Sequence, residues 1–444
     1  MYSLAFRTLL FPVIEYSSGT TIQKHLAFLN KSQWWSKAQI DELQNKKLRA
    51  LIHHAYDNVP YYHRMFTQIG ITPDDIKTKD DLKKMPVLTK DDIRKNLPDI
   101  LAKNIGKSGR IKAHSSGSTG EPMKYYITSK SYSAGWAQTF RCWGWAGYEF
   151  GDPYVKLSLN PRNSFRKTIQ DMFFNCQYIY ATGITEQSIN QEIEKIRRFN
   201  PKILRNYASH MYTMAKLMEK NNIHYQGAAV TTTGSTLYPH FRQIIEKQFN
   251  CKVFNAYGGE GTTVAFECEQ HNGLHICDED VTVEFLKQGD QVDPGEPGRI
   301  VFTNLNNYAM PFIRYDIKDI GIYSDELCPC GRGLSLMKSV EGRDSDIIMT
   351  PSGDFIVVEF FVILFEYIQG VDQFQVIQER IDHLTVKIVK NMSFTDNDLN
   401  HIKNEIQKRA GSEVNIEINF VNEIPLSGIS GKRRFVISNV PLSL

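Results

Sequence analysis

The stretch HSSGSTGEPMKYY, residues 114–126, gathers small polar residues at one place in the chain. Residues 115–120 are all Ser, Gly or Thr, and Pro122 and Lys124 follow them. Hydroxyls and unhindered backbone N–H groups in one loop can wrap a phosphate chain, whereas a turn between two strands requires only the Gly and Pro residues. A Walker loop is excluded, because Pro122 stands five residues after Gly117 where that pattern requires Gly. The stretch is therefore either a phosphate-binding loop or a turn.

The secondary structure on both sides of this loop predicts an α/β fold. Before it, residues 36–105 are mostly helical, with Ser36 and Thr89 as the N-caps of two helices. After it, short β-rich runs alternate with helical runs, which is typical of α/β proteins with a mainly parallel sheet. The β-rich runs are KYYIT, PYVKLSL, CKVFNAY and RIVFTNL, and the helical runs are QSINQEIEKIRRF and PHFRQIIEKQF.

A change of pattern near EGRDSDII, residues 341–348, predicts a domain boundary. Beyond it the order strand, strand, helix, strand indicates a small α+β domain. We therefore expect a large N-terminal domain over residues 1–343, of which residues 1–107 form a mostly helical lead-in. A mobile lid domain is expected over residues 344–444.

Composition narrows the class of protein further. The 444 residues are 41% hydrophobic with a net charge of +3, and the basic residues are spread along the chain, so nothing indicates nucleic-acid binding. The apolar N-terminal residues 1–16 are interrupted by Arg7 and Pro12, so we expect a short helix on the protein, with peripheral membrane contact as the alternative, rather than a signal peptide. Seven cysteines, an odd number, predict reduced thiols and a cytoplasmic location.

Five segments, in order along the chain, resemble the adenylate-forming superfamily of acyl-CoA synthetases, luciferases and peptide-synthetase adenylation domains. HAYDNVPYYHRMF (54–66) and CPCGR (328–332), with the short length, are similar to its phenylacetate–CoA ligase-like branch, which includes CapK-type proteins associated with capsular polysaccharide synthesis. The five segments are SSGSTGEPMK (115–124), AYGGEGTTVAFEC (256–268), IRYDIKDIG (313–321), EGRDSDII (341–348) and IPLSGISGKRRF (424–435).

This resemblance implies the residues that bind ATP. Tyr257 would cover the adenine and Asp319 would accept the ribose hydroxyls, with Asp316 as a nearby rival. Asp319 and Arg343 have the alternative of a surface ion pair, which contributes little to stability. The full set implied for the nucleotide is Ser115, Ser116, Gly117, Ser118, Thr119, Gly120, Lys124, Gly234, Tyr257, Asp319 and Arg343.

The resemblance also implies two catalytic residues. Glu260 would hold Mg²⁺ through a carboxylate oxygen, although it follows Tyr257 by three positions where the branch usually has four. Lys432 would contact the carboxylate and the α-phosphate during adenylation. The alternative for Lys432, which precedes Arg433 and Arg434, is a solvated basic turn.

A metal site is predicted by four cysteine and histidine residues. Three thiolates and one imidazole suit a tetrahedral structural zinc ion, and the Cys-x-Cys pair at 328–330 follows the segment CEQHNGLHIC. The alternative ligands are His271 and Cys277, and the alternative to a metal is a set of idle thiols. The predicted zinc ligands are Cys268, His275, Cys328 and Cys330.

Together these features predict ATP-dependent activation of a carboxylic acid as an acyl-AMP, followed by transfer to CoA. The C-terminal domain would rotate about residues 344–346 to deliver and then remove Lys432. One alternative is an adenylate-forming ligase that acylates an amino sugar, and another is a nucleotide-binding homologue without chemistry. Candidates for the acyl pocket are Trp143, Trp145, Tyr207 and residues 231–235.

Overall fold

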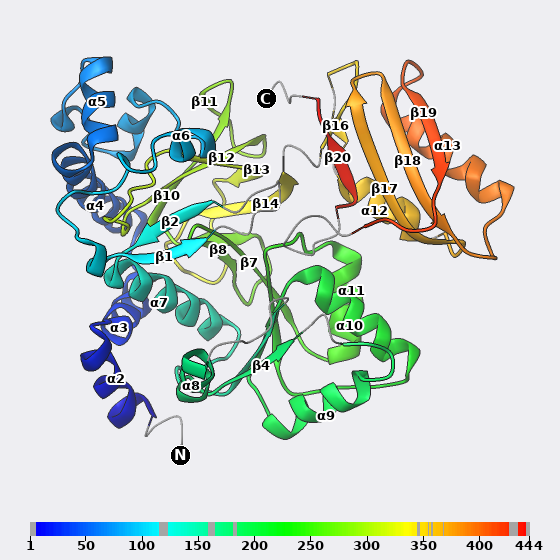
Figure 1. Cartoon of the computed structure of the whole chain (residues 1–444), viewed down its shortest axis with the longest axis horizontal. Coiled ribbons are helices and arrows are strands. Elements are labelled where there is room, and N and C mark those ends of the chain that lie inside the picture. The colour runs from blue at the N-terminus through cyan, green and yellow to red at the C-terminus, as the bar shows by residue number, and fades with distance from the viewer. Residues whose placement is uncertain are drawn as a thin grey trace.

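Figure 1 shows a large part built around one twisted sheet and a smaller part that contains the C-terminal strands. The first is bounded by the N-terminal helices, and the second begins after strand β14 (Leu336–Arg343). The computed structural model describes residues 6–114, 123–158, 165–180, 184–343, 347–353, 355–356, 358–366, 368–425 and 434–440.

The helical lead-in forms where its capping residues predict. The Ser36 side chain accepts a hydrogen bond from the Gln39 N–H, and Gln39 reciprocates at the Ser36 backbone, so a capping box starts α4. Thr89 and Asp92 form the same box at the start of α6. The lead-in comprises the π-helical turn η1 (Phe6–Leu10), α2 (Phe11–Ser18), α3 (Ile22–Ser32), α4 (Lys37–Asn58), α5 (Pro60–Ile69), η2 (Pro73–Asp75), η3 (Lys79–Lys84), α6 (Lys90–Lys95) and η4 (Lys107–Gly109).

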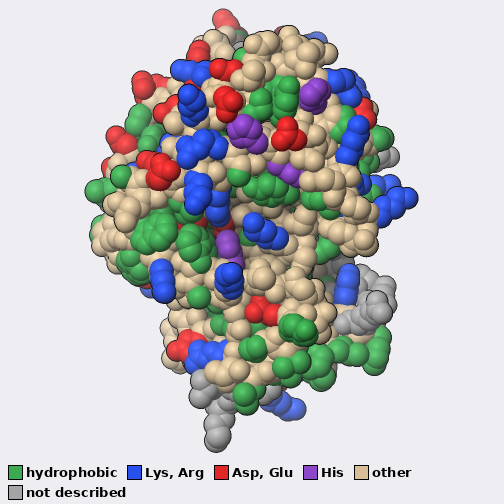
Figure 2. All heavy atoms as spheres, turned by 90° about the vertical axis from the view of Figure 1, so that its left-hand side faces the viewer, with side chains coloured by type: hydrophobic (Ala, Val, Ile, Leu, Met, Phe, Trp, Pro, Cys, Tyr) green, Lys and Arg blue, Asp and Glu red, His purple; other side chains and the backbone are tan. Residues whose placement is uncertain are grey.

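The N-terminal helix rests on the protein, as expected. Phe6 and Phe11 are buried, and their rings lie 5.7 and 4.8 Å from that of Phe150. The opposite side of the helix exposes Val13 and Tyr16. Figure 2, which looks onto the lead-in side, shows basic and acidic side chains interspersed, with apolar side chains gathered near the lower edge. Among the described residues, no helix is both long and apolar enough to cross a bilayer.

The main sheet has twelve strands in the order β11-β10-β12-β13-β14-β9-β8-β7-β6-β5-β3-β4. Strands β4, β3, β5, β6 and β7 are parallel, and the remaining pairs are antiparallel. The α/β class is therefore confirmed, with the parallel order confined to one half of the sheet. The strands are β3 (Tyr154–Ser158), β4 (Cys176–Tyr180), β5 (Ile203–Asn206), β6 (Ala229–Thr233), β7 (Val253–Gly259), β8 (Thr262–Glu267), β9 (Leu274–Ile276), β10 (Val281–Lys287), β11 (Asp290–Gln291), β12 (Pro297–Asn304), β13 (Tyr315–Ser324) and β14.

The parallel strands are buried on both faces, which explains their apolar composition. Leu204 and Val230 share one core with helices α9, α10 and α11. Ile203 and Phe254 point to the other face and share a core with α7. The helices around this sheet are α7 (Ser129–Trp145), α8 (Phe165–Phe173), α9 (Ile189–Phe199), α10 (Ala208–Lys220) and α11 (Pro239–Phe249).

The C-terminal part is a four-stranded sheet with order β19-β18-β17-β20, covered by helices. The strand, strand, helix, strand pattern forms as predicted, and Thr395 caps the helix. Helix α12 and strand β20 were not predicted. The elements are β15 (Ile348–Met349), β16 (Phe355–Ile356), α12 (Val358–Glu366), β17 (Val371–Arg380), β18 (His383–Lys390), α13 (Asp396–Ala410), β19 (Asn415–Phe420) and β20 (Val436–Ser438).

Candidate active site and metal centre

A cleft with a volume of about 1490 Å³ opens at the carboxyl ends of β5, β6 and β7. Ligands of open α/β sheets bind at this edge, because the loops after parallel strands meet there. Strands β13 and β14 and helix α7 form other walls, and Arg434 and Phe435 of the C-terminal part also line the cleft. The cleft therefore lies where the two parts of the chain meet.

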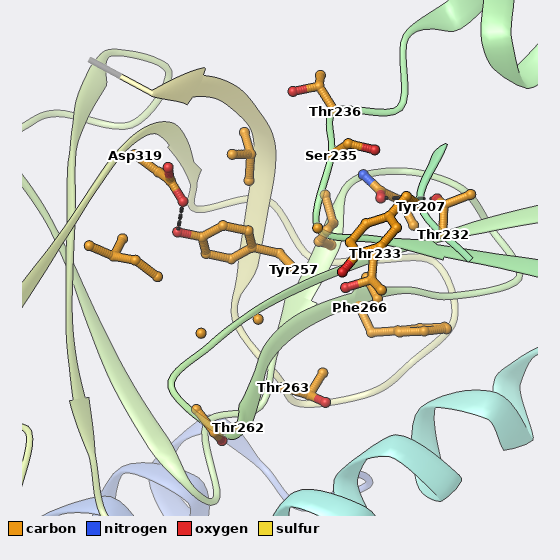
Figure 3. Close-up of a pocket in the computed structure, with 18 of the residues that line it drawn as sticks. Tyr207, Thr232, Thr233, Ser235, Thr236, Tyr257, Thr262, Thr263, Phe266 and Asp319 are labelled. Atoms are coloured by element: carbon orange, nitrogen blue, oxygen red, sulfur yellow. Dashed lines mark hydrogen bonds between the residues drawn. The ribbon is translucent and has the colours of Figure 1, made fainter. Parts of the chain in front are cut away.

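Tyr257 and Asp319 meet inside this cleft (Figure 3). The Tyr257 hydroxyl donates a hydrogen bond of 2.8 Å to Asp319 Oδ2. The rival Asp316 is buried, and its Oδ2 lies 3.0 Å from Lys318 Nζ and 3.6 Å from Arg299 Nη1. Two cations thus already compensate Asp316, which favours Asp319 for an incoming hydroxyl-bearing ligand.

Glu260 occupies a two-residue turn between β7 and β8. Gly259 pairs with Thr262, and Glu260 and Gly261 have φ of 44° and 81°, which is the geometry of a type I′ hairpin turn. The Tyr315 hydroxyl lies 3.4 Å from Glu260 Oε1. Burial, with the nearby Glu260 carboxylate, raises the pKa of Tyr315 and Tyr125 well above the usual tyrosine value, so both remain neutral donors.

Helix α7 contacts the turn between β7 and β8 and holds it in place. Gln138 Oε1 accepts hydrogen bonds from Thr262 Oγ1 at 2.9 Å and the Thr263 N–H at 3.2 Å. Gly135 allows the helix to approach, since a Cβ there would lie 2.6 Å from the Gly261 carbonyl oxygen. Neither residue belongs to a recognisable motif, so no sequence pattern indicates their role.

The strand ends supply hydroxyl groups. Thr232, Thr233, Ser235 and Thr236 line one side of the cleft (Figure 3), and Gly234 has φ of 69° within this run. Of the acyl-pocket candidates, Trp143, Tyr207 and residues 231–235 line the cleft.

Trp145 is the exception among these candidates and does not line the cleft. Its ring lies 5.5 Å from that of His275, and its Nε1–H donates to Gln33 Oε1 at 2.8 Å. Trp145 therefore belongs to the core beside the cysteine cluster rather than to the acyl pocket.

The small-residue loop connects two paired strands, β1 (Ile111–His114) and β2 (Lys124–Ile127). His114 stands opposite Lys124, and residues 111–114 line the cleft, whereas Lys124 is exposed and is not among the lining residues. Residues 115–120, Lys432 and the side chain of Arg343 lie outside the described part of the structure. The Arg343 backbone pairs with Asp319.

The four predicted zinc ligands converge. Their ligand atoms all lie within 4.8 Å of one another. Cys268 Sγ is 3.6 Å from Cys328 Sγ, and Cys330 Sγ is 3.2 Å from His275 Nε2. His275 Nδ1 faces the Leu334 carbonyl at 3.4 Å, which leaves Nε2 for a metal. Burial lowers the pKa of His275 to about 4, so its imidazole is neutral at pH 7.

The alternative ligands, His271 and Cys277, do not belong to this cluster. His271 Nδ1 lies 3.4 Å from Glu267 Oε2, and Cys277 Sγ accepts a 3.3 Å hydrogen bond from Arg141. Ligand sulfurs of a tetrahedral zinc site with Zn–S of about 2.3 Å are roughly 3.8 Å apart, close to the spacing of Cys268 and Cys328. None of the four converging residues lines the cleft.

The chain is similar to several known proteins. Residues 348–439 match the model of the CapK C-terminal domain. The chain is 26% identical to Protein CapK of Staphylococcus aureus, over 90% of this chain and 89% of that protein. It is 27% identical to phenylacetate-coenzyme A ligase of Escherichia coli K12, over 91% and 97% of the two chains. It shares its fold with 2-hydroxyisobutyryl-CoA ligase in the postadenylation state, with a TM-score of 0.73, 19% identity and coverage of 91% and 90%.

The chain therefore has the fold of an adenylate-forming CoA ligase. Its relatives include CapK and phenylacetate-coenzyme A ligases, and residues 348–439 match the CapK C-terminal domain.

Proposed function

We propose that this chain activates a carboxylic acid with ATP and transfers the acyl group to CoA. A carboxylate oxygen attacks the α-phosphorus, the bond from that phosphorus to the β-bridging oxygen breaks, and pyrophosphate leaves. The CoA thiolate then attacks the acyl carbon, and AMP leaves as the thioester forms. The observation that carries this proposal is the convergence of Tyr257, Asp319 and Glu260 in one cleft of a chain whose homologues include CoA ligases.

Tyr257 and Asp319 would hold the nucleoside. The Tyr257 hydroxyl fixes one carboxylate oxygen of Asp319, which orients the group to accept the ribose hydroxyls. Gly234, with its positive φ, keeps the backbone at the end of β6 open to the ligand. The loop 115–120, Lys124 and Arg343 are proposed to bind the phosphates and the nucleotide, on the strength of the sequence resemblance.

Glu260 would hold Mg²⁺, whose charge neutralises phosphate oxygens during the reaction. Its φ of 44° is uncommon for a residue other than glycine, and such backbone conformations cluster at functional sites. Helix α7 keeps this turn in place through Gln138. The position of Glu260 therefore depends on how closely α7 can approach.

Replacing Gly135 with alanine is expected to displace this turn. The new Cβ would press on the Gly261 carbonyl oxygen at 2.6 Å, and overpacking of this kind costs about 1–3 kcal/mol. Misplaced catalytic groups should lower the adenylation rate by roughly tenfold or more. Gly144→Ala is the matched control, because it lies in the same helix and its Cβ would meet nothing within 4 Å. Equal rates in the two variants would contradict a positioning role for α7.

Movement of the C-terminal part is proposed to separate the two half-reactions. Two conformations of the same 2-hydroxyisobutyryl-CoA ligase match this chain to different degrees, with TM-scores of 0.73 in the postadenylation state and 0.59 in the thioesterification state. The arrangement of this chain is thus nearer to the first conformation. Rotation about residues 344–346 would move Lys432 away from the acyl-AMP and let CoA reach it.

An amide ligase that acylates an amino sugar is the second candidate. The match of residues 348–439 to the CapK C-terminal domain favours it, because the C-terminal part faces the cleft where the acceptor must enter. Product analysis with ATP and Mg²⁺, with either CoA or an amino sugar over a panel of acids, tests the choice. A thioester supports the CoA ligase, an amide supports the alternative, and the absence of any pyrophosphate release supports the non-catalytic homologue.

We also propose that Cys268, His275, Cys328 and Cys330 hold one structural zinc ion. Three thiolates and a neutral imidazole match the donors that zinc prefers, and four protein ligands close the coordination sphere. The ion would join the β8–β9 hairpin to the loop before β14. It would brace the sheet beside the cleft without taking part in the reaction.

The Asp319→Ala variant is expected to bind ATP more weakly. Hydrogen bonds to a charged group contribute about 1.5–3 kcal/mol each, so kcat/KM for ATP should fall by roughly 10- to 100-fold. ATP-dependent pyrophosphate exchange over a range of ATP concentrations measures the effect.

Two further variants complete the Asp319 experiment. Asp325→Ala removes an exposed carboxylate near the end of the same strand, outside the cleft, and should leave the kinetics unchanged. Asp316→Ala tests the rival, and a larger effect on KM for ATP there than at Asp319 would reverse the assignment.

A further inference from the structure

Arg205, the third residue of β5, lines the inner part of the cleft as a cation without a carboxylate partner among the described residues. Burial lowers the pKa of Arg205, and the neighbouring side chains of Tyr154, Tyr207 and Cys176 partly oppose this shift. Its guanidinium carbon lies 5.9 Å from the ring centroid of Trp143, near the outer limit of about 6 Å for a cation–π contact.

The sequence offers no acidic partner on the neighbouring strand ends. Residues 159–164, which follow β3, read LNPRNS, and residues 181–183, which follow β4, read ATG. Neither segment contains Asp or Glu. Because buried charges in proteins are normally paired, an unpaired guanidinium at the wall of a cleft points to an anion supplied from outside.

A second polar group beside Arg205 also lacks a partner. Thr231 on β6 stands opposite Arg205 in the sheet register, lines the same cleft and is only 1% exposed. Its Oγ1 has no hydrogen-bond partner in the described part of the chain. Buried polar atoms are rarely left unsatisfied, so the Arg205 guanidinium and the Thr231 hydroxyl together form a candidate site for a hydrogen-bond acceptor.

The position of this pair separates it from the nucleotide end. Arg205 precedes Tyr207 by two residues, and Thr231 precedes Thr233 by two, which places the pair roughly 6–7 Å from Tyr207 and Thr233 along the chain. Trp143 from α7 lies beside Arg205 and lines the same cleft. An acid of about six carbon atoms, or an aromatic acid, spans this distance.

We propose that the acid substrate carries a second anionic group, such as a carboxylate, which binds Arg205 and Thr231 while its other carboxylate reacts with ATP. The guanidinium fork can bind this group through two parallel hydrogen bonds, and the Thr231 hydroxyl adds a third. Trp143 and Tyr207 contact the carbon body between the two ends. This inference rests on the proposed adenylation and names the class of its substrate.

The test uses matched acids that differ only in the second carboxylate. Hexanoate is compared with adipate, and phenylacetate with 4-carboxyphenylacetate, in pyrophosphate exchange. The wild type should prefer the diacid of each pair by about 10- to 100-fold in kcat/KM, the effect of a charged hydrogen-bonded contact. Arg205→Met should abolish this preference and leave the monoacid rates within about threefold, whereas Arg205→Lys should retain part of it.

The control is Arg198→Met, because Arg198 is exposed on α9 and its loss should leave the preference intact. A wild-type preference for monoacids would overturn the proposal. An equal loss of kcat/KM for the monoacid and the diacid in Arg205→Met would also overturn it, because that result would place Arg205 at the reacting carboxylate. Thermal unfolding of each variant checks that it folds.

Calorimetry separates this proposal from the proposed function. If no acid supports pyrophosphate exchange, the adenylation proposal fails, while direct binding still reports on Arg205. Adipate binding to the wild type that disappears in Arg205→Met would support the anion site. Equal binding of adipate and hexanoate, or no adipate binding, would refute it.

Discussion

Lys432→Ala is expected to lower the rate of acyl-adenylate formation by about 10²–10³, the usual loss when one group that stabilises transition-state charge is removed. The segment SGISGKRRF resembles the lysine loop of the superfamily, and its last two residues, Arg434 and Phe435, line the cleft. Charge builds on the α-phosphate only as the carboxylate attacks. The lysine therefore acts mainly on the rate of adenylation rather than on substrate binding.

Two comparisons give the Lys432 prediction its specificity. Transfer of the acyl group from supplied acyl-AMP to the acceptor should stay near the wild-type rate. In that half-reaction the acceptor attacks the acyl carbon, so no charge develops from attack at the α-phosphorus. Arg433→Ala, which removes the adjacent cation, should change adenylation by less than about threefold. If both variants lost adenylation equally, the segment would be a general basic turn, and near-normal exchange in Lys432→Ala would refute the assignment.

Local signals in the sequence identified the capped helices, whereas α7, α8 and α10 were not predicted. Ser36 and Thr89 are N-caps in the structure because each has a partner three residues later that completes a capping box. Helix α12, VEFFVILFE, was missed because almost every position is apolar, so the pattern has no helical period. The antiparallel half of the sheet was missed for a related reason, since composition does not report the direction of the neighbouring strand.

The site was predictable only where residues belong to a motif. Tyr257, Glu260 and Asp319 stand in segments that resemble a known family, and the fold brings them to one cleft. Arg205 and Thr231 belong to no such segment, and they become neighbours only through the register of β5 and β6. Trp145 does not line the cleft, because a residue two positions from the cleft-lining Trp143 on a helix points to a different side.

The register of the strands explains why the four residues of the cysteine cluster lie together. Strand β8 ends just before Cys268, and β9 brings back His275, which stands opposite Phe266 and next to Leu336 of β14. The loop with Cys328 and Cys330 leads into β14, so it ends beside His275. The register of three strands therefore brings the four ligands together, although Cys268 and Cys328 are 60 residues apart in the sequence.

Cys268→Ser is expected to remove the zinc and destabilise the protein by at least about 3 kcal/mol, since loss of a metal is among the few single changes with effects this large. The loop before β14 is also tied to the lead-in. The Gly333 N–H donates to the Gln33 carbonyl at 3.0 Å, and Arg332 pairs with Glu269 at 3.0 Å. Loosening this loop would therefore disturb the contact between the sheet and helices α3 and α4.

Metal analysis and thermal unfolding together test this expectation. Wild-type protein should contain about one zinc ion per chain, and Cys268→Ser should contain far less and melt roughly 3–5 °C lower. Cys251→Ser is the matched control, because Cys251 is a free thiol outside the cluster and should keep both the zinc and the melting temperature. Chelation of the wild type should reproduce the Cys268→Ser melting temperature, since both remove the same cross-link. Metal-free wild type that melts at the temperature of the untreated protein would leave the four residues as ordinary core side chains.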